Sequence, residues 1–85
     1  MIVIYSTKFY REYKRIPINI KKQAEKMETI FKLNPFNPIL KTHKLTGNLK
    51  DFWSFSIDYK NRIIFEFISE NTVCFHSIGS HQIYK

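Results

Sequence analysis

The sequence predicts an α+β fold with the element order β-α-α-β-β-β, in which an antiparallel sheet carries two N-terminal helices on one face. Two patterns predict it. Apolar residues recur every three or four positions between residues 8 and 33, as in amphipathic helices, and alternate with polar residues between 52 and 78, as in half-buried strands. We expect the 85 residues to form one domain, residues 1–85, with a single modest core. Eight Phe, five Tyr and one Trp supply large side chains to fill it.

The chain begins with an expected strand and helix. Residues 1–5 are an apolar run with β-branched side chains, which favour a strand. Ser6 or Thr7 is expected to cap the following helix by accepting a hydrogen bond from a backbone N–H in its first turn. Pro17 ends this helix. Its apolar stripe consists of Phe9, Tyr10, Tyr13 and Ile16.

A second helix follows, antiparallel to the first. Asn19 is its expected cap. It ends before the Asn34-Pro35 pair, because a residue that precedes proline is pushed out of the helical region. Residues 35–50 show neither period clearly and are expected to form an ordered connection with a turn or a short strand. The apolar stripe of the second helix consists of Ile20, Ala24, Met27, Ile30 and Phe31.

The second half of the chain predicts a hairpin and a last strand. Residues 52–58 and 62–68 alternate in polarity and are joined by Tyr59-Lys60-Asn61. Residues 72–78 alternate as well, and Gly79 is expected to end that strand. One face of the hairpin presents Trp53, Phe55, Ile57, Ile63, Phe65 and Phe67. Two helices with one stripe each cover one sheet face, so we expect the other face, which carries Arg62, to be open to solvent or to a phosphate.

Composition narrows the function. Fourteen Lys and Arg against seven Asp and Glu give a formal charge of +7, which favours RNA, DNA or an acidic protein as partner. Cys74 is the single cysteine, so no disulfide forms within the chain, as is usual in the reducing cytoplasm. The first residues meet charge too early for a signal peptide, and no apolar run is long enough to span a membrane. Three His and one Cys lack paired metal-ligand spacing, so no metal site and no cofactor are expected.

Two segments carry a resemblance to a known family. The run from Leu49 to Phe67 contains the strings Trp53-Ser54, Ile57-Asp58 and Arg62-Ile63-Ile64-Phe65, and the chain nearly ends in Ile78-Gly79-Ser80-His81-Gln82-Ile83-Tyr84. These residues resemble the RelE/ParE superfamily of toxins from bacterial type II toxin-antitoxin systems, most closely its RelE, YoeB and YafQ branches. The resemblance follows the element order of nearly the whole chain. It implies an mRNA interferase, an endoribonuclease that cuts mRNA in the ribosomal A site, inhibits translation and is silenced by a cognate antitoxin.

Four residues match family positions. Arg62 matches the strand arginine of the RelE and YoeB branches. His81 falls where YafQ-like members carry a histidine and RelE carries an arginine. Tyr84 resembles the aromatic residue near the C-terminus, and His43 resembles the YafQ loop histidine. The chain departs from YafQ at Ser56 and Lys60, which replace a histidine and an aspartate, and at Ser77, which replaces an arginine.

The implied reaction needs no metal, because the 2′-hydroxyl of RNA attacks the adjacent phosphorus. Arg62 suits stabilisation of the charge on phosphorus, since its guanidinium binds two phosphate oxygens. His81 suits proton transfer. Tyr84 suits stacking on a base of the message. The remaining RNA-binding candidates are His43, Lys44, Lys50 and Lys41.

Each assignment has a simpler alternative. Arg62 is also placed to pair with Glu66 as a surface residue, and His81 to be a solvated tail histidine. Tyr84 also suits packing of the tail against the domain. His43 and the lysines also suit a solvated loop. His76 is expected to be structural, and Cys74 is expected to be a small buried side chain without chemistry.

Two other functions remain open on the same fold. One is a ParE-like inhibitor of DNA gyrase without nuclease activity, and the other is a degenerate, non-toxic member that only binds antitoxin. In every version we expect an acidic antitoxin segment over the basic face or along the sheet, with the ribosome and mRNA as further partners of a nuclease. We expect no membrane and no small-molecule cofactor.

Overall fold

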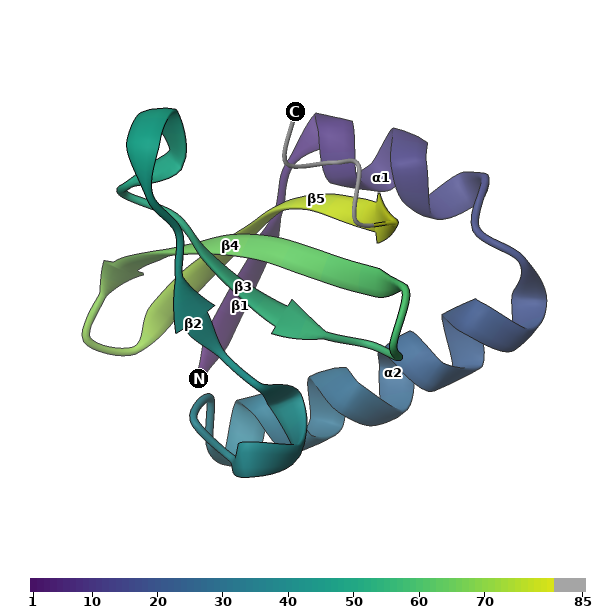
Figure 1. Cartoon of the computed structure of the whole chain (residues 1–85), viewed down its shortest axis with the longest axis horizontal. Coiled ribbons are helices and arrows are strands. Elements are labelled where there is room, and N and C mark those ends of the chain that lie inside the picture. The colour runs from purple at the N-terminus through teal and green to yellow at the C-terminus, as the bar shows by residue number, and fades with distance from the viewer. Residues whose placement is uncertain (81–85) are drawn as a thin grey trace.

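The computed structural model describes residues 1–80, in which two helices accompany a five-stranded mixed sheet (Figure 1). The strand order is β1-β5-β4-β3-β2, with β1 parallel to β5 and the other neighbours antiparallel. The predicted α+β class is confirmed, with β2 as a short strand in the central connection, but the sheet is mixed rather than antiparallel because β1 pairs in parallel with β5. The elements are β1 (Ile2–Tyr5), α1 (Thr7–Lys14), α2 (Ile18–Leu33), β2 (His43–Lys44), β3 (Trp53–Ser56), β4 (Asn61–Ser69) and β5 (Thr72–Ser80), with 3₁₀ turns at Pro38–Leu40 and Gly47–Leu49.

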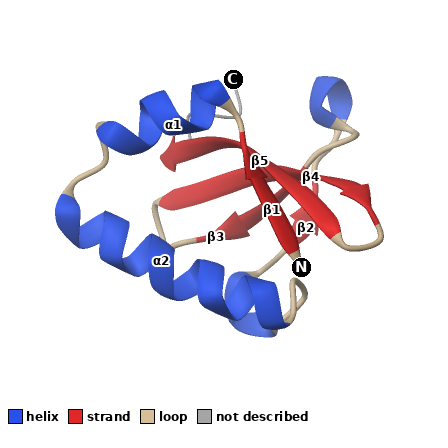
Figure 2. Cartoon of the chain, turned by 180° about the vertical axis from the view of Figure 1, so that it is seen from behind, coloured by secondary structure: helices blue, strands red, loops and turns tan. Residues whose placement is uncertain are grey.

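The helix boundaries differ from the sequence signals at two points: α1 ends at Lys14, before Pro17 is reached, and α2 is not capped by Asn19. The Ser6 hydroxyl accepts a hydrogen bond from the Phe9 amide at 3.0 Å, which confirms it as the cap of α1. The prediction of Asn19 as the second cap is wrong, because Pro17 stands at that position and Asn19 lies inside α2. The Pro17 carbonyl accepts from the amides of Ile20 and Lys21, so α2 starts without a side-chain cap. Figure 2 shows how the chain reverses direction between the two helices.

Four phenylalanines hold the helices to the sheet. The Phe31 ring of α2 lies 4.7 Å from that of Phe55, 4.8 Å from Phe65 and 5.5 Å from Phe75, between ring centroids. All four side chains are fully buried. Phe9 of α1 contacts Phe75 as well, with centroids 5.7 Å apart. Burying each such ring stabilises the fold by about 1.5 to 3 kcal/mol, so this cluster fixes α2 beneath the β3-β4 hairpin. Neither helix of residues 1–80 has the length and apolar character needed to cross a bilayer.

The last strand differs from the prediction in two ways. Gly79 does not end it, because β5 continues to Ser80 and Gly79 pairs with Arg62. Glycine keeps both backbone hydrogen-bonding groups, and here the ladder with β4 continues through them. The pairing also shifts register between Ile64 and Phe65, and this irregularity brings Ile78 rather than Ser77 into the core.

The second sheet face is less open than expected. Ser54 is fully buried and Ile64 is 4% exposed, although both lie on the face opposite the phenylalanine cluster. Strong exposure occurs at the margins of this face, at Ile2, Ile4 and Ile68.

Helix α1 completes the sheet beside β5. Strand β1 pairs with β5 only as far as Phe75. Beyond that point the Glu12 carboxylate of α1 accepts hydrogen bonds from the Ser77 hydroxyl at 2.7 Å and from the Ile78 amide at 3.1 Å. These bonds satisfy edge groups that no strand pairs with, and they fix the part of β5 that runs beside Arg62.

Candidate functional site

A groove lies where the β3-β4 turn meets α2 and the segment after the Pro38–Leu40 turn. Its volume is about 310 Å³. Three cationic side chains line it, and Asp58 is the one acid among its lining residues. We call it the basic groove. It is lined by Gln23, Lys26, Met27, Ile39, Lys41, Ser56, Ile57, Asp58, Tyr59 and Arg62.

The turn at the end of the groove is locked by Asp58. Its Oδ1 accepts hydrogen bonds from the Lys60 amide at 2.8 Å and from the Asn61 amide at 2.7 Å. Burial raises the pKa of the Asp58 carboxyl, but the Asn61 and Lys60 bonds and the charge of Arg62 outweigh it, so the pKa lies below its usual range. Strand β3 therefore ends at Ser56, two residues earlier than expected, because Asp58 serves the turn.

The locked turn anchors Arg62. Its Nη1 donates to the backbone carbonyls of Asp58 at 2.7 Å and Asn61 at 3.0 Å. No described residue accepts a hydrogen bond from Nε or Nη2, so this edge of the guanidinium is available for a ligand. The alternative pairing with Glu66 is not found, since Glu66 instead contacts His76. Arg62 is thus a pre-positioned fork for an anion such as a phosphate.

Lys41 lines the basic groove, and His43 lies two residues further along the chain, at the start of β2. Lys41 adopts a left-handed backbone conformation with φ 52°, and its side chain lines the basic groove. His43 Nδ1 lies 3.0 Å from the Lys41 carbonyl oxygen. Because a carbonyl only accepts, Nδ1 is the donor in this contact, and in the uncharged form of this exposed ring Nε2 would be the acceptor.

Strand register relates His43 to Arg62. His43 pairs with Ser54, and Arg62 pairs with Ser56 two residues further along β3. Both therefore project from the same sheet face. Strand spacings of about 4.8 Å and a rise of about 3.4 Å per residue separate their backbones by roughly 12 Å.

The structure does not bring every predicted residue to this site. Lys44 pairs with Trp53, so it projects from the face opposite His43. Lys50 follows the Gly47–Leu49 turn before β3, at the end of the hairpin away from Arg62. His81 and Tyr84 lie outside the described residues. Of the predicted set, Arg62 and Lys41 line the basic groove, whereas His43 is related to Arg62 only by projecting from the same sheet face.

Two groove residues were not predicted as part of the site. Tyr59, at the tip of the hairpin, is 87% exposed and was taken only as a turn residue. Lys26 lies outside the predicted apolar stripe of α2, and it lines the groove. The packing of α2 under the hairpin decides both placements, and a one-dimensional pattern does not contain it. An aromatic residue at an exposed turn was the one available signal for Tyr59.

His76 takes part in a separate polar cluster. Its Nε2 lies 3.1 Å from Glu66 Oε1, and its Nδ1 lies 4.0 Å from Cys74 Sγ. The Phe52 ring packs edge-on against it, with centroids 4.9 Å apart. Burial, and secondly the charge of Glu66, raise the pKa of the Cys74 thiol, so the thiol stays protonated. Within residues 1–80 no three or more His, Cys, Asp or Glu side chains are grouped to hold a metal.

Comparison with known proteins defines the class of this fold. No family model and no curated protein matches the sequence. Solved structures do match. YafQ from E. coli strain BL21(DE3) superposes with a TM-score of 0.81 at 16% identity, covering 96% of this chain and 94% of that one. The YoeB/ParE toxin from Agrobacterium tumefaciens gives 0.79 at 18% identity, covering 95% and 99%.

A further neighbour was solved as a complex. The YoeB-YefM complex from Staphylococcus aureus gives a TM-score of 0.76 at 20% identity, covering 95% of this chain and 97% of that one. The protein thus has the fold of the RelE/YoeB/YafQ toxins, and the resemblance seen in the sequence is confirmed at the level of the fold.

Proposed function

We propose that this protein is the toxin of a type II toxin-antitoxin system and acts as a ribosome-dependent mRNA endoribonuclease. The observation that carries the proposal is the anchored guanidinium of Arg62, whose Nη1 is held by two carbonyls and which lines a groove together with two lysines. The fold shared with YafQ and YoeB supports it. So does the family position of Arg62.

The reaction divides among three tasks. His43 Nε2 accepts the proton of the 2′-hydroxyl, whose oxygen then attacks the adjacent phosphorus. Arg62 binds the nonbridging oxygens as charge builds on them, without reorganising. The bond from phosphorus to the 5′-oxygen breaks, and a general acid protonates that oxygen. The products are a 2′,3′-cyclic phosphate and a 5′-hydroxyl.

His81 is the proposed general acid, and Tyr84 is proposed to orient a base. Support for His81 comes from chain connectivity. It directly follows Ser80, and Ser80 pairs with Asn61, the residue before Arg62. Lys26 and Lys41 are proposed to bind flanking phosphates. Lys44 and Lys50, away from the groove, are proposed to contact ribosomal RNA instead.

A ribosome is proposed to be required because the site is sparse. Few groups converge on the proposed phosphate, so most of the rate enhancement must come from an mRNA held in attack geometry. The antitoxins YefM and DinJ in neighbouring complexes support a cognate antitoxin as the second partner. An acidic segment is expected to bind the basic groove and block it. The protein is proposed to act in the cytoplasm, where translating ribosomes are found.

Programmed ribosomes test the proposal. Purified protein is added to ribosomes with a defined codon in the A site and to the same mRNA alone. We expect cleavage within the A-site codon, a 5′-hydroxyl on the downstream fragment, and no cleavage when the attacking nucleotide lacks its 2′-hydroxyl. Cleavage of the 2′-deoxy message, or none on ribosomes, contradicts the proposal. In the second case a supercoiling assay with DNA gyrase tests the ParE-like alternative.

A further inference from the structure

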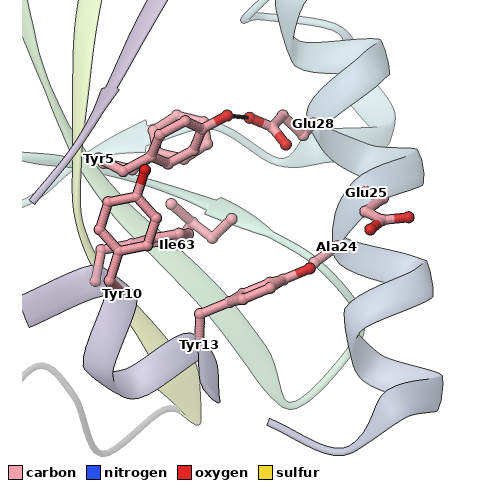
Figure 3. Close-up of a pocket in the computed structure, with 9 residues that line it drawn as sticks. Tyr5, Tyr10, Tyr13, Ala24, Glu25, Glu28 and Ile63 are labelled. Atoms are coloured by element: carbon pink, nitrogen blue, oxygen red, sulfur yellow. Dashed lines mark hydrogen bonds between the residues drawn. The ribbon is translucent and has the colours of Figure 1, made fainter. Parts of the chain in front are cut away.

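A second cleft opens between α1 and α2, away from the basic groove. Its volume is about 190 Å³. Figure 3 shows Tyr10 and Tyr13 projecting from α1 toward it, with Glu25 and Glu28 on α2 across the opening. We call it the tyrosine cleft. It is lined by Tyr5, Phe9, Tyr10, Tyr13, Ala24, Glu25, Glu28, Ile63 and Phe75.

The charge of this cleft is opposite to that of the whole chain. The protein carries a formal charge of +7, yet the residues that line the cleft include two of its seven acids and no Lys or Arg. The Glu25 carboxylate has no ion pair or hydrogen bond among residues 1–80, and Glu25 is one of the residues that line the cleft. The lining residues therefore favour a cation, and two cations already lie beside them, Lys32 next to Glu28 and Lys21 over the Tyr13 ring.

Glu28 is held in place at the cleft wall. Its Oε2 accepts a hydrogen bond from the Tyr5 hydroxyl, and Lys32 Nζ lies 3.9 Å from the same oxygen. Within the described chain Oε1 makes no such contact. Burial, followed by the bond to Glu28, raises the pKa of Tyr5, so the phenol remains a neutral donor. The arrangement leaves one fixed carboxylate oxygen for an incoming donor.

Aromatic rings make the walls suitable for a cation. Tyr13 already takes Lys21 Nζ over its ring, 5.3 Å from the centroid. Tyr10 is 55% exposed and tilts against Tyr5, with centroids 5.7 Å apart. The floor, formed by Phe9, Ile63 and Phe75, is apolar. A side chain with an aliphatic stem and a planar cationic head fits all three surfaces, since guanidinium stacks on aromatic rings and pairs with carboxylates.

We infer that the tyrosine cleft receives an arginine side chain of the antitoxin, which anchors the antitoxin to the helices while an acidic segment covers the basic groove. The partner's identity rests on the proposed function, whereas the preference of the cleft for guanidinium does not. A buried arginine at the centre of a contact is a common source of binding energy. The two clefts then demand opposite charges from one partner, which selects against wrong antitoxins.

A titration with a small probe tests the cleft directly. N-acetyl-arginine amide is added to the full chain, and two-dimensional NMR follows the backbone amides of Ala24 and Ile63. We expect saturable shifts at these amides, and weaker binding by about tenfold in the double variant Glu25→Gln Glu28→Gln. N-acetyl-citrulline amide, which has the same shape without the charge, is expected not to bind. Glu70→Gln, in the exposed β4-β5 turn, is the matched control and is expected to behave as wild type.

Equal shifts with citrulline, equal affinity in the double variant, or shifts confined to other surfaces overturn the inference. A cellular test then addresses the partner. The variant Glu25→Arg Glu28→Arg is expected to cut RNA normally but to escape neutralisation by the antitoxin, and one Arg→Glu change in the antitoxin is expected to restore neutralisation. Full neutralisation of this variant contradicts the antitoxin as occupant. If wild-type protein cuts no RNA, the proposed function fails, and the probe titration still decides the cleft.

Discussion

The basic groove and the tyrosine cleft lie on one small domain and differ in almost every physical property. The lining of the basic groove includes Lys26, Lys41 and Arg62. Its one acid, Asp58, accepts hydrogen bonds from backbone amides of the turn. The tyrosine cleft is lined by three tyrosines and two carboxylates over an apolar floor. The positive net charge of the chain matches the sign of the charge in the basic groove, whereas the tyrosine cleft is lined by acids.

The difference shows where pre-organisation is concentrated. In the basic groove, backbone carbonyls hold the Arg62 guanidinium before any ligand arrives, which suits stabilisation of a transient charge. In the tyrosine cleft, Glu28 is held by a neutral phenol and the Glu25 carboxylate has no partner among residues 1–80, which suits a partner that stays bound. We therefore assign chemistry to the groove and recognition to the cleft, and the following predictions test that division.

The largest effect is expected at Arg62. Arg62→Ala should lower the single-turnover rate on programmed ribosomes by about 10³-fold, because it removes the main stabiliser of charge on phosphorus. Arg62→Lys keeps the positive charge but loses the planar guanidinium that binds two oxygens. Its rate should therefore lie between those of wild type and Arg62→Ala. Thermal unfolding of each variant serves as the control, because Arg62 also bonds to the turn. A full rate in Arg62→Ala would remove this residue from the mechanism.

The next effect is expected at His43. His43→Asn keeps a donor for the Lys41 carbonyl and removes the free ring nitrogen, so the rate should fall by about 10²-fold while folding is unchanged. His76→Asn is the matched histidine control, since His76 belongs to the separate cluster with Glu66. The same stopped-time assay on programmed ribosomes measures both variants. Equal losses in the two variants would show that the effect is not specific to the site.

A smaller effect is expected at the tip of the hairpin. Tyr59→Ala should weaken binding of the message by about tenfold, as stacking on one base contributes about 1 to 3 kcal/mol. Tyr59→Phe retains the ring and should bind normally. The measurement is the concentration of protein needed for half-maximal cleavage, with the maximal rate unchanged. A change in the maximal rate alone would instead point to a role in the chemical step.

The smallest effect is expected in the tyrosine cleft, as a dependence of stability on pH. Folding raises the pKa of Tyr5 above its usual 10.0. The protonated phenol therefore contributes its full share to the free energy of unfolding below pH 10, and this share is lost as the pH rises above 10. Urea unfolding at pH 8 and pH 11 should therefore show a larger loss of stability for wild type than for Tyr5→Phe. Identical losses of stability in wild type and Tyr5→Phe would indicate that the folded protein does not stabilise the protonated Tyr5 phenol.

Local patterns predicted the elements well because they depend on neighbours in sequence. The Ser6 cap, the stop before Pro35 and the hairpin all follow from residues within a few positions of each other. The register irregularity in β5 and the continuation through Gly79 did not, because both depend on pairing with β4. The sequence shows where apolar and polar residues alternate along a strand. Pairing with a distant strand determines where the register shifts, so that the alternation between sheet faces changes.

The site was predicted in part for a similar reason. The resemblance placed Arg62 and His43 among the candidates, but it could not show that a turn carbonyl holds one and that the Lys41 carbonyl sets the tautomer of the other. Lys44 and Lys50 were predicted to bind RNA because they are cationic. Strand alternation places Lys44 on the sheet face opposite His43, and Lys50 lies at the end of the hairpin away from Arg62. The tyrosine cleft was not predicted at all, since Tyr5, Tyr13 and Glu28 meet only when β1, α1 and α2 pack together.

The most direct test of the central claim is a map of new 5′ ends on translated transcripts after the protein is induced in cells without antitoxin. The account predicts ends within codons in the ribosomal A site for wild type, and their loss in the double variant Arg62→Ala His43→Asn. Absence of such ends in wild type, or their persistence in the double variant, would contradict the assignment of chemistry to the basic groove.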